Sequence, residues 1–299
     1  MATQSTVEVD GRQLTLTNLE KILYPATGFT KAAVLNYYVQ IAPFLLPHLQ
    51  RRALTMVRWP DGVDGPSFFE KRCPPHAPDW VVTGEAEPGL FGCVVDDRAT
   101  LVWVANLASL ELHTKQLTVD DPVHPTSMVF DLDPGPPAGV LQCAEVGLEL
   151  RDVLSELGLD CVVKTSGGKG LHLNVPVHGS TADETKEFAR AVGQILERRD
   201  PKRVTTVMRK DLRRNKVFVD WSQNDSHKTT VTAYSLRAQP RPTVSTPLEW
   251  DEVRDALESG DPKRLEFEAH EVLERVQEHG DLYEANLTLE QRLPDVGRR

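Results

Sequence analysis

The sequence predicts an α+β fold with helices packed on one side of a sheet. Segments with strand-like and helix-like spacing of apolar residues follow one another without the strict strand–helix–strand alternation of parallel sheets. No internal repeat, low-complexity tract or long flexible linker separates them. The only candidate junction is the proline-rich segment 240–247. We therefore expect a single domain over residues 1–299, in which residues 247–299 form an acidic, helical C-terminal part.

The order of elements follows from the spacing of apolar residues. Residues 30–49 are expected to form a helix, because Thr30 is a suitable N-cap and apolar residues recur every three or four positions. Similar spacing predicts helices over residues 106–113, 141–157, 183–199, 247–259 and 266–278. Runs of β-branched and apolar residues bounded by turns predict strands over residues 54–59, 101–105, 127–133, 162–165, 171–175 and 217–221.

The composition is that of an ordinary globular protein, with 40% hydrophobic and 26% charged residues. No apolar run is long enough to predict a membrane span, and the first residues lack an export signal. The four cysteines include no C-x-x-C pair. We therefore expect a cytoplasmic protein with reduced, mostly buried thiols rather than a disulfide framework or a zinc cluster.

The net charge of −10 argues superficially against a nucleic-acid partner, but the charge is unevenly distributed. Residues 249–299 carry 15 acidic and 7 basic side chains. Residues 198–216 carry 9 basic and 2 acidic side chains. This basic segment either faces a polyanion or forms a solvated helix surface, and the charge pattern alone does not choose between them.

Two carboxylates end the predicted strand 127–133. Asp131 and Asp133 are two positions apart, so their side chains point to the same face. A lone D-x-D of this kind is more often a solvated strand end. A third acid, Asp220, ends another predicted strand, Val-Phe-Val-Asp. Three carboxylates at strand ends favour a site for divalent cations and metal-dependent phosphate chemistry.

A glycine-rich segment, Thr-Ser-Gly-Gly-Lys-Gly at 165–170, joins two predicted strands. Ser166, Gly167 and the following amides can form a nest for an anion, to which Lys169 adds a positive charge. The alternative is an ordinary tight hairpin. The spacing is not that of a P-loop. His113 and His172 are candidates for the same site, although a lone histidine is more often structural.

Several motifs together resemble those of a known family. They are Phe-Asp-Leu-Asp-Pro-Gly (130–135), Thr-Ser-Gly-Gly-Lys-Gly-Leu-His (165–172), Val-Phe-Val-Asp-Trp-Ser-Gln-Asn (217–224), Leu-Glu-Lys-Ile-Leu-Tyr-Pro (19–25), Gly-Pro-Ser-Phe-Phe-Glu-Lys (65–71), Leu-Glu-Leu-His (110–113) and Tyr-Ser-Leu-Arg (234–237). In this order the chain resembles bacterial primase-polymerases of the archaeo-eukaryotic primase superfamily, in particular the polymerase domain of DNA ligase D. The resemblance extends from about residue 14 to about residue 283.

The resemblance implies a fold of mixed and antiparallel sheets flanked by helices, with the active site in a central cleft. It also implies a template-directed nucleotidyltransferase that extends a primer 3′ end with NTPs or dNTPs. Two divalent cations, Mn²⁺ or Mg²⁺, would be held by Asp131, Asp133 and Asp220. Contacts to the triphosphate and sugar would come from His113, Ser166, Gly167, Lys169, Arg214, Lys216, Gln223 and Arg237.

Recognition of DNA is implied at a separate set of residues. Lys21 and Lys31 would bind a downstream 5′-phosphate, and Phe68 and Phe69 would stack on template bases. The structural alternatives are solvated lysines and core phenylalanines, since of two adjacent phenylalanines at least one is usually buried. The implied partners are gapped or broken DNA, NTPs or dNTPs, a Ku-type end-binding protein and a ligase. No membrane is involved, and the expected location is the nucleoid in the cytoplasm.

The main functional hypothesis is gap filling and end extension during double-strand break repair by non-homologous end joining. One alternative is a primase-polymerase of excision repair or primer synthesis. A second, from another class, is a metal-dependent nucleotide phosphohydrolase that uses the same three acids. A third is a DNA-end-binding module without catalysis. No K-x-D-G sequence is present, so the adenylating lysine motif of a DNA ligase is absent.

Overall fold

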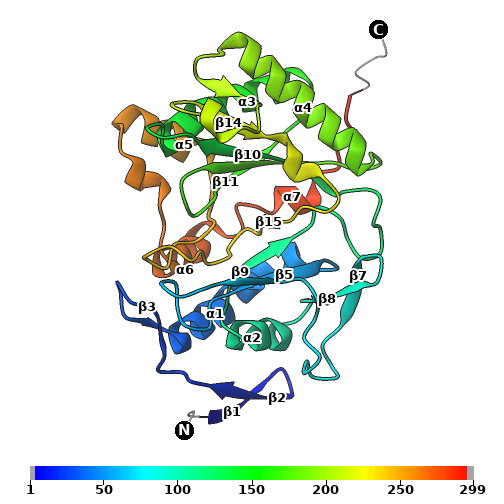
Figure 1. Cartoon of the computed structure of the whole chain (residues 1–299), viewed down its shortest axis with the longest axis vertical. Coiled ribbons are helices and arrows are strands. Elements are labelled where there is room, and N and C mark those ends of the chain that lie inside the picture. The colour runs from blue at the N-terminus through cyan, green and yellow to red at the C-terminus, as the bar shows by residue number, and fades with distance from the viewer. Residues whose placement is uncertain (1–3, 295–299) are drawn as a thin grey trace. The chain divides into compact units, whose positions relative to one another are not determined.

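The computed structural model describes residues 4–294 of the 299-residue chain (Figure 1). It consists of two compact units. Unit 1 takes its described residues from Met1–Lys115, Thr229–Ser245 and Phe267–Gly280. Unit 2 takes them from Gln116–Lys228, Thr246–Glu266 and Asp281–Arg299. Both units combine helices with sheets that are largely antiparallel, which confirms the predicted α+β class.

Unit 1 contains a six-stranded sheet in the order β15-β9-β5-β8-β7, with β6 paired to β5. Every strand pair in it is antiparallel. The strands are β5 (Ala53–Arg58), β6 (Phe68–Glu70), β7 (Thr83–Glu87), β8 (Leu90–Val94), β9 (Ser109–Thr114) and β15 (Thr230–Val231). Two hairpins complete the unit: β1 (Gln4–Val9) with β2 (Arg12–Thr17), and β3 (Ile22–Tyr24) with β4 (Phe29–Thr30).

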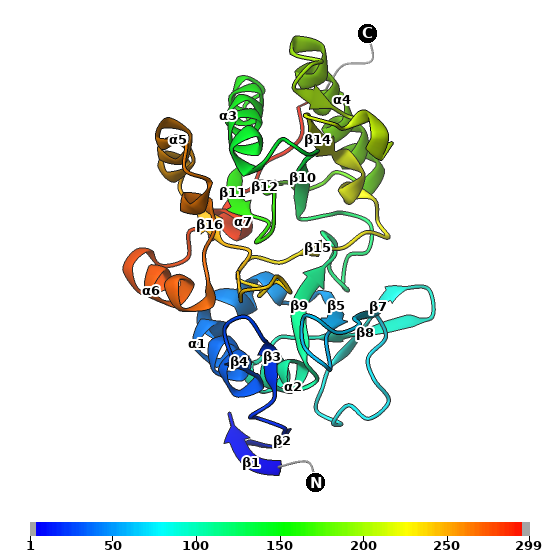
Figure 2. The same ribbon diagram turned by 60° about the vertical axis from the view of Figure 1, so that its left-hand side comes forward.

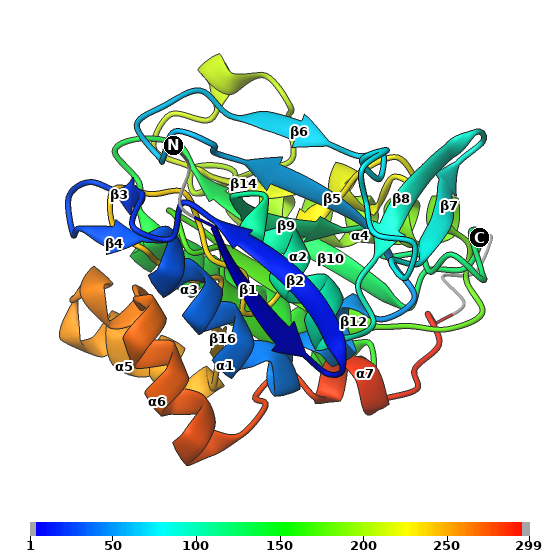
Figure 3. The same cartoon turned by 90° about the horizontal axis from the view of Figure 1, so that it is seen from below.

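The helices of unit 1 pack around α1 (Lys31–Leu49). Thr30 caps this helix by accepting a hydrogen bond from the Ala33 amide, as predicted. On α1 pack α2 (Arg98–Asn106) and α6 (Ala269–His279), and the β1–β2 hairpin contacts α2 (Figure 3). The apolar stripe of α1 is therefore buried between helices, and the spacing of its apolar residues predicted this helix from the sequence.

Three tyrosines fix a loop against α1 and β9. Buried Tyr37 and Tyr38 donate hydroxyl protons to the Tyr234 and Leu110 carbonyls at 2.8 Å. The hydroxyl of Tyr24 donates to the Arg237 carbonyl at 3.0 Å. Because a buried hydroxyl without a partner is costly, these bonds hold the 234–237 loop in one position.

One pair of predicted elements is wrong. Residues 101–105 belong to helix α2 rather than to a strand, and residues 109–114 form strand β9 rather than a helix. The whole run 99–105 is buried, and a short apolar run has no periodicity that separates a buried helix from a strand. Asp97 is the N-cap of α2, because its side chain accepts a hydrogen bond from the Thr100 amide. This cap favours a helix over a strand here.

Unit 2 contains a second six-stranded sheet, in the order β13-β14-β10-β12-β11-β16. Only the β13–β14 pair is parallel. The strands are β10 (Ser127–Pro134), β11 (Val162–Thr165), β12 (Leu171–Pro176), β13 (Val204–Thr205), β14 (Val217–Asp220) and β16 (Pro247–Leu248). The strands predicted at 127–133, 162–165, 171–175 and 217–221 are thus confirmed to within a few residues.

Helices α3 (Val140–Glu156) and α4 (Ala182–Arg199) cover one face of this sheet (Figure 2). Gly147 of α3 faces the side chains of Leu132, Leu171 and Leu173. Since side chains alternate along a strand, Asp131 and His172 point to the opposite face. The prediction that helices pack on one side holds for α3 and α4, whereas the short helix α7 (Ala285–Thr288) contacts the other face, where Ser127 donates to Asn286.

The predicted C-terminal helices begin later than expected. Residues 247–248 pair with β11 as β16, and α5 starts at Trp250 and ends at Ser259. The helix α5 packs on α3 in unit 2, whereas α6 belongs to unit 1. Short helical segments complete the chain: η1 (Lys210–Leu212), η2 (Trp221–Asn224), η3 (Pro262–Leu265) and α7 (Ala285–Thr288). One passage of the chain between the units, at 245/246, lies in the proline-rich segment.

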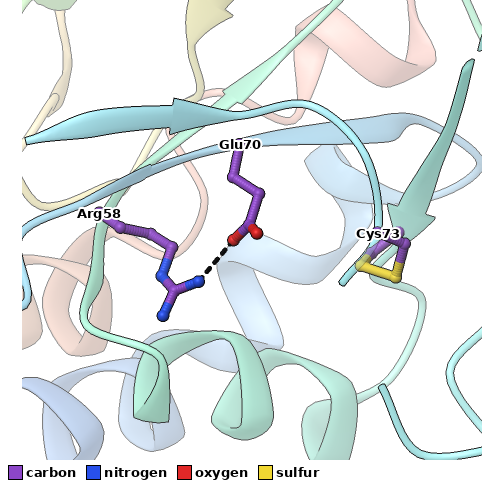
Figure 4. The surroundings of a disulfide bond; sticks show 4 residues. Arg58, Glu70 and Cys73 are labelled. Carbon is purple, nitrogen blue, oxygen red and sulfur yellow. Dashed lines mark hydrogen bonds and ion pairs between the residues drawn. A yellow bond between two sulfur atoms is a disulfide. The ribbon is translucent and has the colours of Figure 1, made fainter. Parts of the chain in front are cut away.

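The expectation of four reduced thiols is wrong, because Cys73 and Cys93 form a disulfide (Figure 4). The Cys73 amide donates to the Phe91 carbonyl, which brings the segment after β6 alongside β8. The two cysteines are 20 positions apart, so no local motif announced the pairing. Cys143 and Cys161 are free thiols. No helix among residues 4–294 is long and apolar enough to cross a membrane.

Candidate active site

Strand register in unit 2 places two of the three predicted acids opposite each other. Asp131 of β10 is the direct cross-strand partner of Asp220 at the end of β14. Directly opposed residues point to the same face of a sheet. Asp133 lies two positions along β10 on that face and is exposed. The separate motifs that carry these acids are thus joined by one strand pair.

The same row of the sheet continues on the other side of β10. Asp131 is also opposite His172 of β12, and His172 is opposite Lys164 of β11. Four adjacent strands therefore carry Lys164, His172, Asp131 and Asp220 in one row, which we call the charged row. All four side chains face away from α3. Their exposed fractions are small, with Lys164 at 2% and Asp220 at 8%.

Hydrogen bonds connect the members of the charged row. His172 Nε2 is 3.2 Å from Asp131 Oδ1. The Gln223 amide donates to Asp131 Oδ2 at 3.5 Å and to Asp220 Oδ2 at 3.1 Å. The other oxygen of Asp220 accepts from the amide and hydroxyl of Ser222. Gln223, predicted as a nucleotide contact, is thereby placed directly between the two carboxylates.

The glycine-rich loop lies beside the acidic strand. A Cβ atom at Gly170 would come within 2.1 Å of the Leu132 carbonyl, so only glycine permits this approach. Gly167 has a φ of +68°, in the left-handed region. The Ser166 hydroxyl accepts hydrogen bonds from the Gly168 and Gly170 amides, which is the hairpin role that the sequence left open. Lys169 is exposed at the tip of the loop.

The end of the basic segment 198–216 lies beside the turn that follows the acidic strand β10. The Gly135 amide donates to the Lys216 carbonyl, and a Cβ at Gly135 would come within 1.9 Å of the Arg213 carbonyl. Arg214 is exposed there, whereas the Lys216 ammonium donates to the Pro201 carbonyl. Arg203 forms ion pairs with three carboxylates, those of Glu145, Glu149 and Asp200. The segment is therefore partly neutralised and partly available to a polyanion.

The donors of the charged row suit a hard divalent cation, because carboxylate oxygens are the ligands that Mg²⁺ and Mn²⁺ prefer. Asp131, Asp133 and Asp220 supply such oxygens from one face of one sheet. Among the residues described, no three His, Cys, Asp or Glu side chains converge closely enough to hold a metal ion. The residues thus fit a cation in donor type and strand register, while the Gln223 amide bridges two of the carboxylates.

Unit 1 holds the remaining predicted nucleotide contacts around one buried carboxylate. Glu111 of β9 lies 2.8 Å from His113 Nε2 and accepts from Arg237 Nε at 3.0 Å. Burial alone would raise the pKa of Glu111. The hydrogen bond from His113 and the charge of Arg237 outweigh burial and lower this pKa to about 2. The buried anion therefore positions the side chains of His113 and Arg237, which are 14% and 19% exposed.

Both phenylalanines of the predicted template platform are exposed, Phe68 to 44% and Phe69 to 66%. The expectation that one of an adjacent pair is buried is wrong here, because β6 is short and pairs only with β5. The Arg58 guanidinium lies 5.1 Å from the centre of the Phe68 ring and pairs with Glu70 at 2.6 Å (Figure 4). The Phe69 ring lies edge-on to His113, with 6.2 Å between centroids.

The two predicted phosphate-binding lysines lie on neighbouring backbone segments. The Lys31 amide donates to the Lys21 carbonyl. The Lys31 ammonium donates to the carbonyl and hydroxyl oxygens of Thr17. Burial, and then the charges of Lys21 and Arg58, lower the pKa of Lys31 to about 8. Lys21 forms an ion pair with Asp61 at 2.7 Å. The positive charges of Lys21 and Arg58 near Lys31 favour the binding of an anion.

The predicted site residues therefore form two groups. Unit 2 brings together Asp131, Asp133, Asp220, Ser166, Gly167, Lys169, Arg214, Lys216 and Gln223. Unit 1 holds His113, Arg237, Lys21, Lys31, Phe68 and Phe69. Sequence reasoning missed Glu111, Arg58 and Lys164. The alternation in Leu-Glu-Leu-His could have indicated Glu111, because on a strand Glu111 shares a face with His113.

Comparisons with known proteins show the family to which the chain belongs. Residues 30–283 match the family model described as LigD, primase-polymerase domain. A multifunctional non-homologous end joining protein LigD from Mycolicibacterium smegmatis is 43% identical over 274 residues, which are 89% of this chain and 35% of that protein. A bifunctional non-homologous end joining protein LigD from Bacillus subtilis is 31% identical over 273 residues, which are 90% of this chain and 43% of that protein.

A solved structure has the same fold. It is described as the polymerase domain from Mycobacterium tuberculosis ligase D in complex with DNA, and it matches with a TM-score of 0.85 and 39% identity. The match covers 92% of this chain and 98% of that one. The chain spans only about two fifths or less of the curated relatives described above. Motifs, fold and family model together place this chain in the LigD primase-polymerase domain family.

Proposed function

We propose that the chain is a template-directed nucleotidyltransferase that adds NTPs or dNTPs to a primer 3′ end. Its role would be to fill gaps and extend ends in double-strand break repair by non-homologous end joining. The observation that carries this proposal is the strand pair that sets Asp131 opposite Asp220, with Asp133 on the same face. The relatives are non-homologous end joining proteins, which supports the pathway.

In this proposal unit 2 handles the reacting phosphates. Two divalent cations, Mg²⁺ or Mn²⁺, when bound by Asp131, Asp133 and Asp220, would lower the pKa of the primer hydroxyl and neutralise phosphate charge. Lys169 and the amides around Gly167 would hold the triphosphate, because an anion nest and an ammonium attract its charge. Gln223, whose amide nitrogen donates to two carboxylates, would accept a hydrogen bond from a nucleotide hydroxyl through its carbonyl oxygen. Arg214 and Lys216 would add positive charge at the same end of the sheet.

Unit 1 would hold the nucleotide and the DNA. His113 and Arg237, both oriented by Glu111, would contact the sugar and triphosphate. Lys21 and Lys31 would bind the 5′-phosphate of a downstream strand, and Phe68 and Phe69 would stack on template bases, which needs no base-specific hydrogen bond. The two units would act as one catalytic domain over residues 1–299.

The wider context is also a proposal. The relatives are described as multifunctional or bifunctional end-joining proteins of which this chain spans a part. We infer that a ligase completes the repair and that a Ku-type protein holds the ends. The protein would work at the nucleoid in the cytoplasm, where broken chromosomal DNA is found.

Primer extension on a gapped duplex tests the proposal. We expect incorporation of templated NTP or dNTP in Mg²⁺ or Mn²⁺, with higher efficiency when the downstream strand carries a 5′-phosphate. Release of phosphate from free nucleotides without primer extension would instead identify a phosphohydrolase. Synthesis on unprimed single strands, with no response to the 5′-phosphate, would point to a primer-synthesising enzyme.

A further inference from the structure

Lys164 is a buried cation that the proposed chemistry leaves unused. It lies in the middle of β11, with 2% of its surface exposed. Its ammonium nitrogen is 3.1 Å from Nδ1 of His172, its direct partner on β12. Burial of an ammonium group is costly unless polar groups compensate for the lost hydration. The position of this lysine behind His172 therefore requires an explanation.

The contact determines where the imidazole proton resides. An ammonium group has three donors and no acceptor, so Nδ1 of His172 must accept the hydrogen bond. The ring proton then lies on Nε2, which faces Asp131 Oδ1 at 3.2 Å. With the proton on Nε2, each ring nitrogen of His172 faces a complementary partner, whereas a proton on Nδ1 would point at the Lys164 donors.

We propose that Lys164 is a positioning residue that fixes His172 as the neutral Nε2–H tautomer and, through it, orients the Asp131 carboxylate. One oxygen of Asp131 is then held by His172, and the other faces Gln223. The row uses three adjacent strands for this purpose, so each partner is placed by backbone register rather than by a flexible loop. A partner that orients a ligand in this way typically changes activity by about 10–100-fold when it is removed.

The tautomer can be read directly by long-range ¹H–¹⁵N correlation NMR of the histidine rings in the metal-free protein. The His172 signals are assigned by their loss in His172→Gln. We expect His172 of the wild type to carry its proton on Nε2 only. A ring proton on Nδ1 would overturn the proposal, and this result needs no substitution of Lys164.

Variants of Lys164 provide the second arm. In Lys164→Met we expect His172 to lose the pure Nε2–H pattern, and in Lys164→Arg, which keeps a buried donor, we expect the pattern to be retained. An unchanged His172 pattern in a folded Lys164→Met variant would contradict the proposal. His178 is an internal control, because its Nε2 accepts from Arg292 and its proton must lie on Nδ1. Its signals should stay the same in every Lys164 variant.

The consequence for catalysis rests on the proposed function and has its own readout. We expect Lys164→Met to lower kcat for nucleotide addition about 10–100-fold. Its affinity for primed DNA should stay unchanged. The matched control is Lys186→Met, which removes a lysine of α4 that is paired with Asp225. This variant should keep full kcat. Equal kcat in Lys164→Met and wild type would refute the positioning role. If the wild type proved inactive, the proposed function would fail while the NMR result on His172 would still stand.

Discussion

The two units present their functional side chains in contrasting ways. In unit 2 the charged row lies on four paired strands, is largely buried and is connected by hydrogen bonds. In unit 1 Phe68 and Phe69, assigned to the template, lie on the three-residue strand β6 and are 44% and 66% exposed. Groups that act on reacting atoms must be held to within a fraction of an ångström, whereas groups that stack on varied bases must remain accessible. Substitutions in the charged row should therefore lower the rate of nucleotide addition, and substitutions at the exposed phenylalanines should lower the affinity for DNA.

The largest effect is expected in the charged row. Asp131→Asn keeps the size of the side chain but removes the charge that would attract cations. We expect nucleotide addition to fall at least about a thousandfold, because charge stabilisation at such a site contributes several kcal/mol to the barrier. DNA binding should be nearly unchanged. Asp152→Asn, an exposed acid of α3 paired with Arg151, is the control in gel-based extension assays. Full extension by Asp131→Asn would remove Asp131 from the active site.

The opposite pattern is expected at the exposed platform. Phe69→Ala should weaken primer–template binding by about 1–3 kcal/mol, the usual contribution of one base–aromatic stack. Because the ring is mostly exposed, its removal should change the free energy of unfolding by no more than about 0.5 kcal/mol. Fluorescence anisotropy and chemical unfolding measure the two quantities. Phe91→Ala removes another exposed phenylalanine of unit 1 and should leave both unchanged. Loss of stability without loss of DNA affinity would favour the structural interpretation.

A pH dependence distinguishes Lys31 from an ordinary surface lysine. Its pKa of about 8 means that the free protein loses this charge between pH 7 and 9, while a bound phosphate dianion would keep the lysine protonated. Binding must then take up a proton at high pH. We expect the affinity ratio of 5′-phosphorylated to unphosphorylated gaps to fall about tenfold from pH 7 to 9. In Lys31→Met the ratio should be low and independent of pH. A constant ratio in the wild type would mean that Lys31 does not bind the phosphate.

At Glu111 the effect is expected on stability rather than on catalysis or DNA binding. Its lowered pKa stabilises the fold above pH 4.5, and this stabilisation is lost as the pH falls from about 4.5 to about 2. Glu111→Gln should therefore cost about 1–3 kcal/mol at pH 7 and flatten the acid limb of the stability curve. Urea unfolding between pH 2 and 7 measures this, with exposed Glu8→Gln as control. An acid limb as steep as that of the wild type would show that other groups govern it.

The same contrast explains how much could be predicted from the sequence. Periodic apolar residues revealed α1, α3 and α4, and apolar runs bounded by turns revealed β10, β11, β12 and β14, whereas β13 and β16 were not predicted. The three acids could be selected because three carboxylates at strand ends together favour a cation site, although one alone would not. The opposition of Asp131 and Asp220 needed the strand register, which joins residues 89 positions apart. Lys164 could not be identified from the sequence, because nothing in a short strand sequence shows that its lysine is buried.

Where tertiary contacts decided the structure, the predictions failed. The buried run 99–105 had no polar face, so it was taken for a strand although it is a helix. The Cys73–Cys93 disulfide depends on the pairing of a loop with β8, which no local motif announces. The exposure of both phenylalanines follows from the short length of β6. The chain enters each of the two units more than once, and of its passages between them only the one at 245/246 lies in the proline-rich segment.

The central claim is that Asp131 and Asp220, made neighbours by the β10–β14 register, act together on a cation. Titration of Mn²⁺ into the wild type and Asp220→Asn, followed by electron paramagnetic resonance, tests this most directly. The account predicts specific binding by the wild type and at least about a tenfold loss of affinity in Asp220→Asn, because a ligand has been removed. Equal Mn²⁺ binding by the two proteins would contradict it.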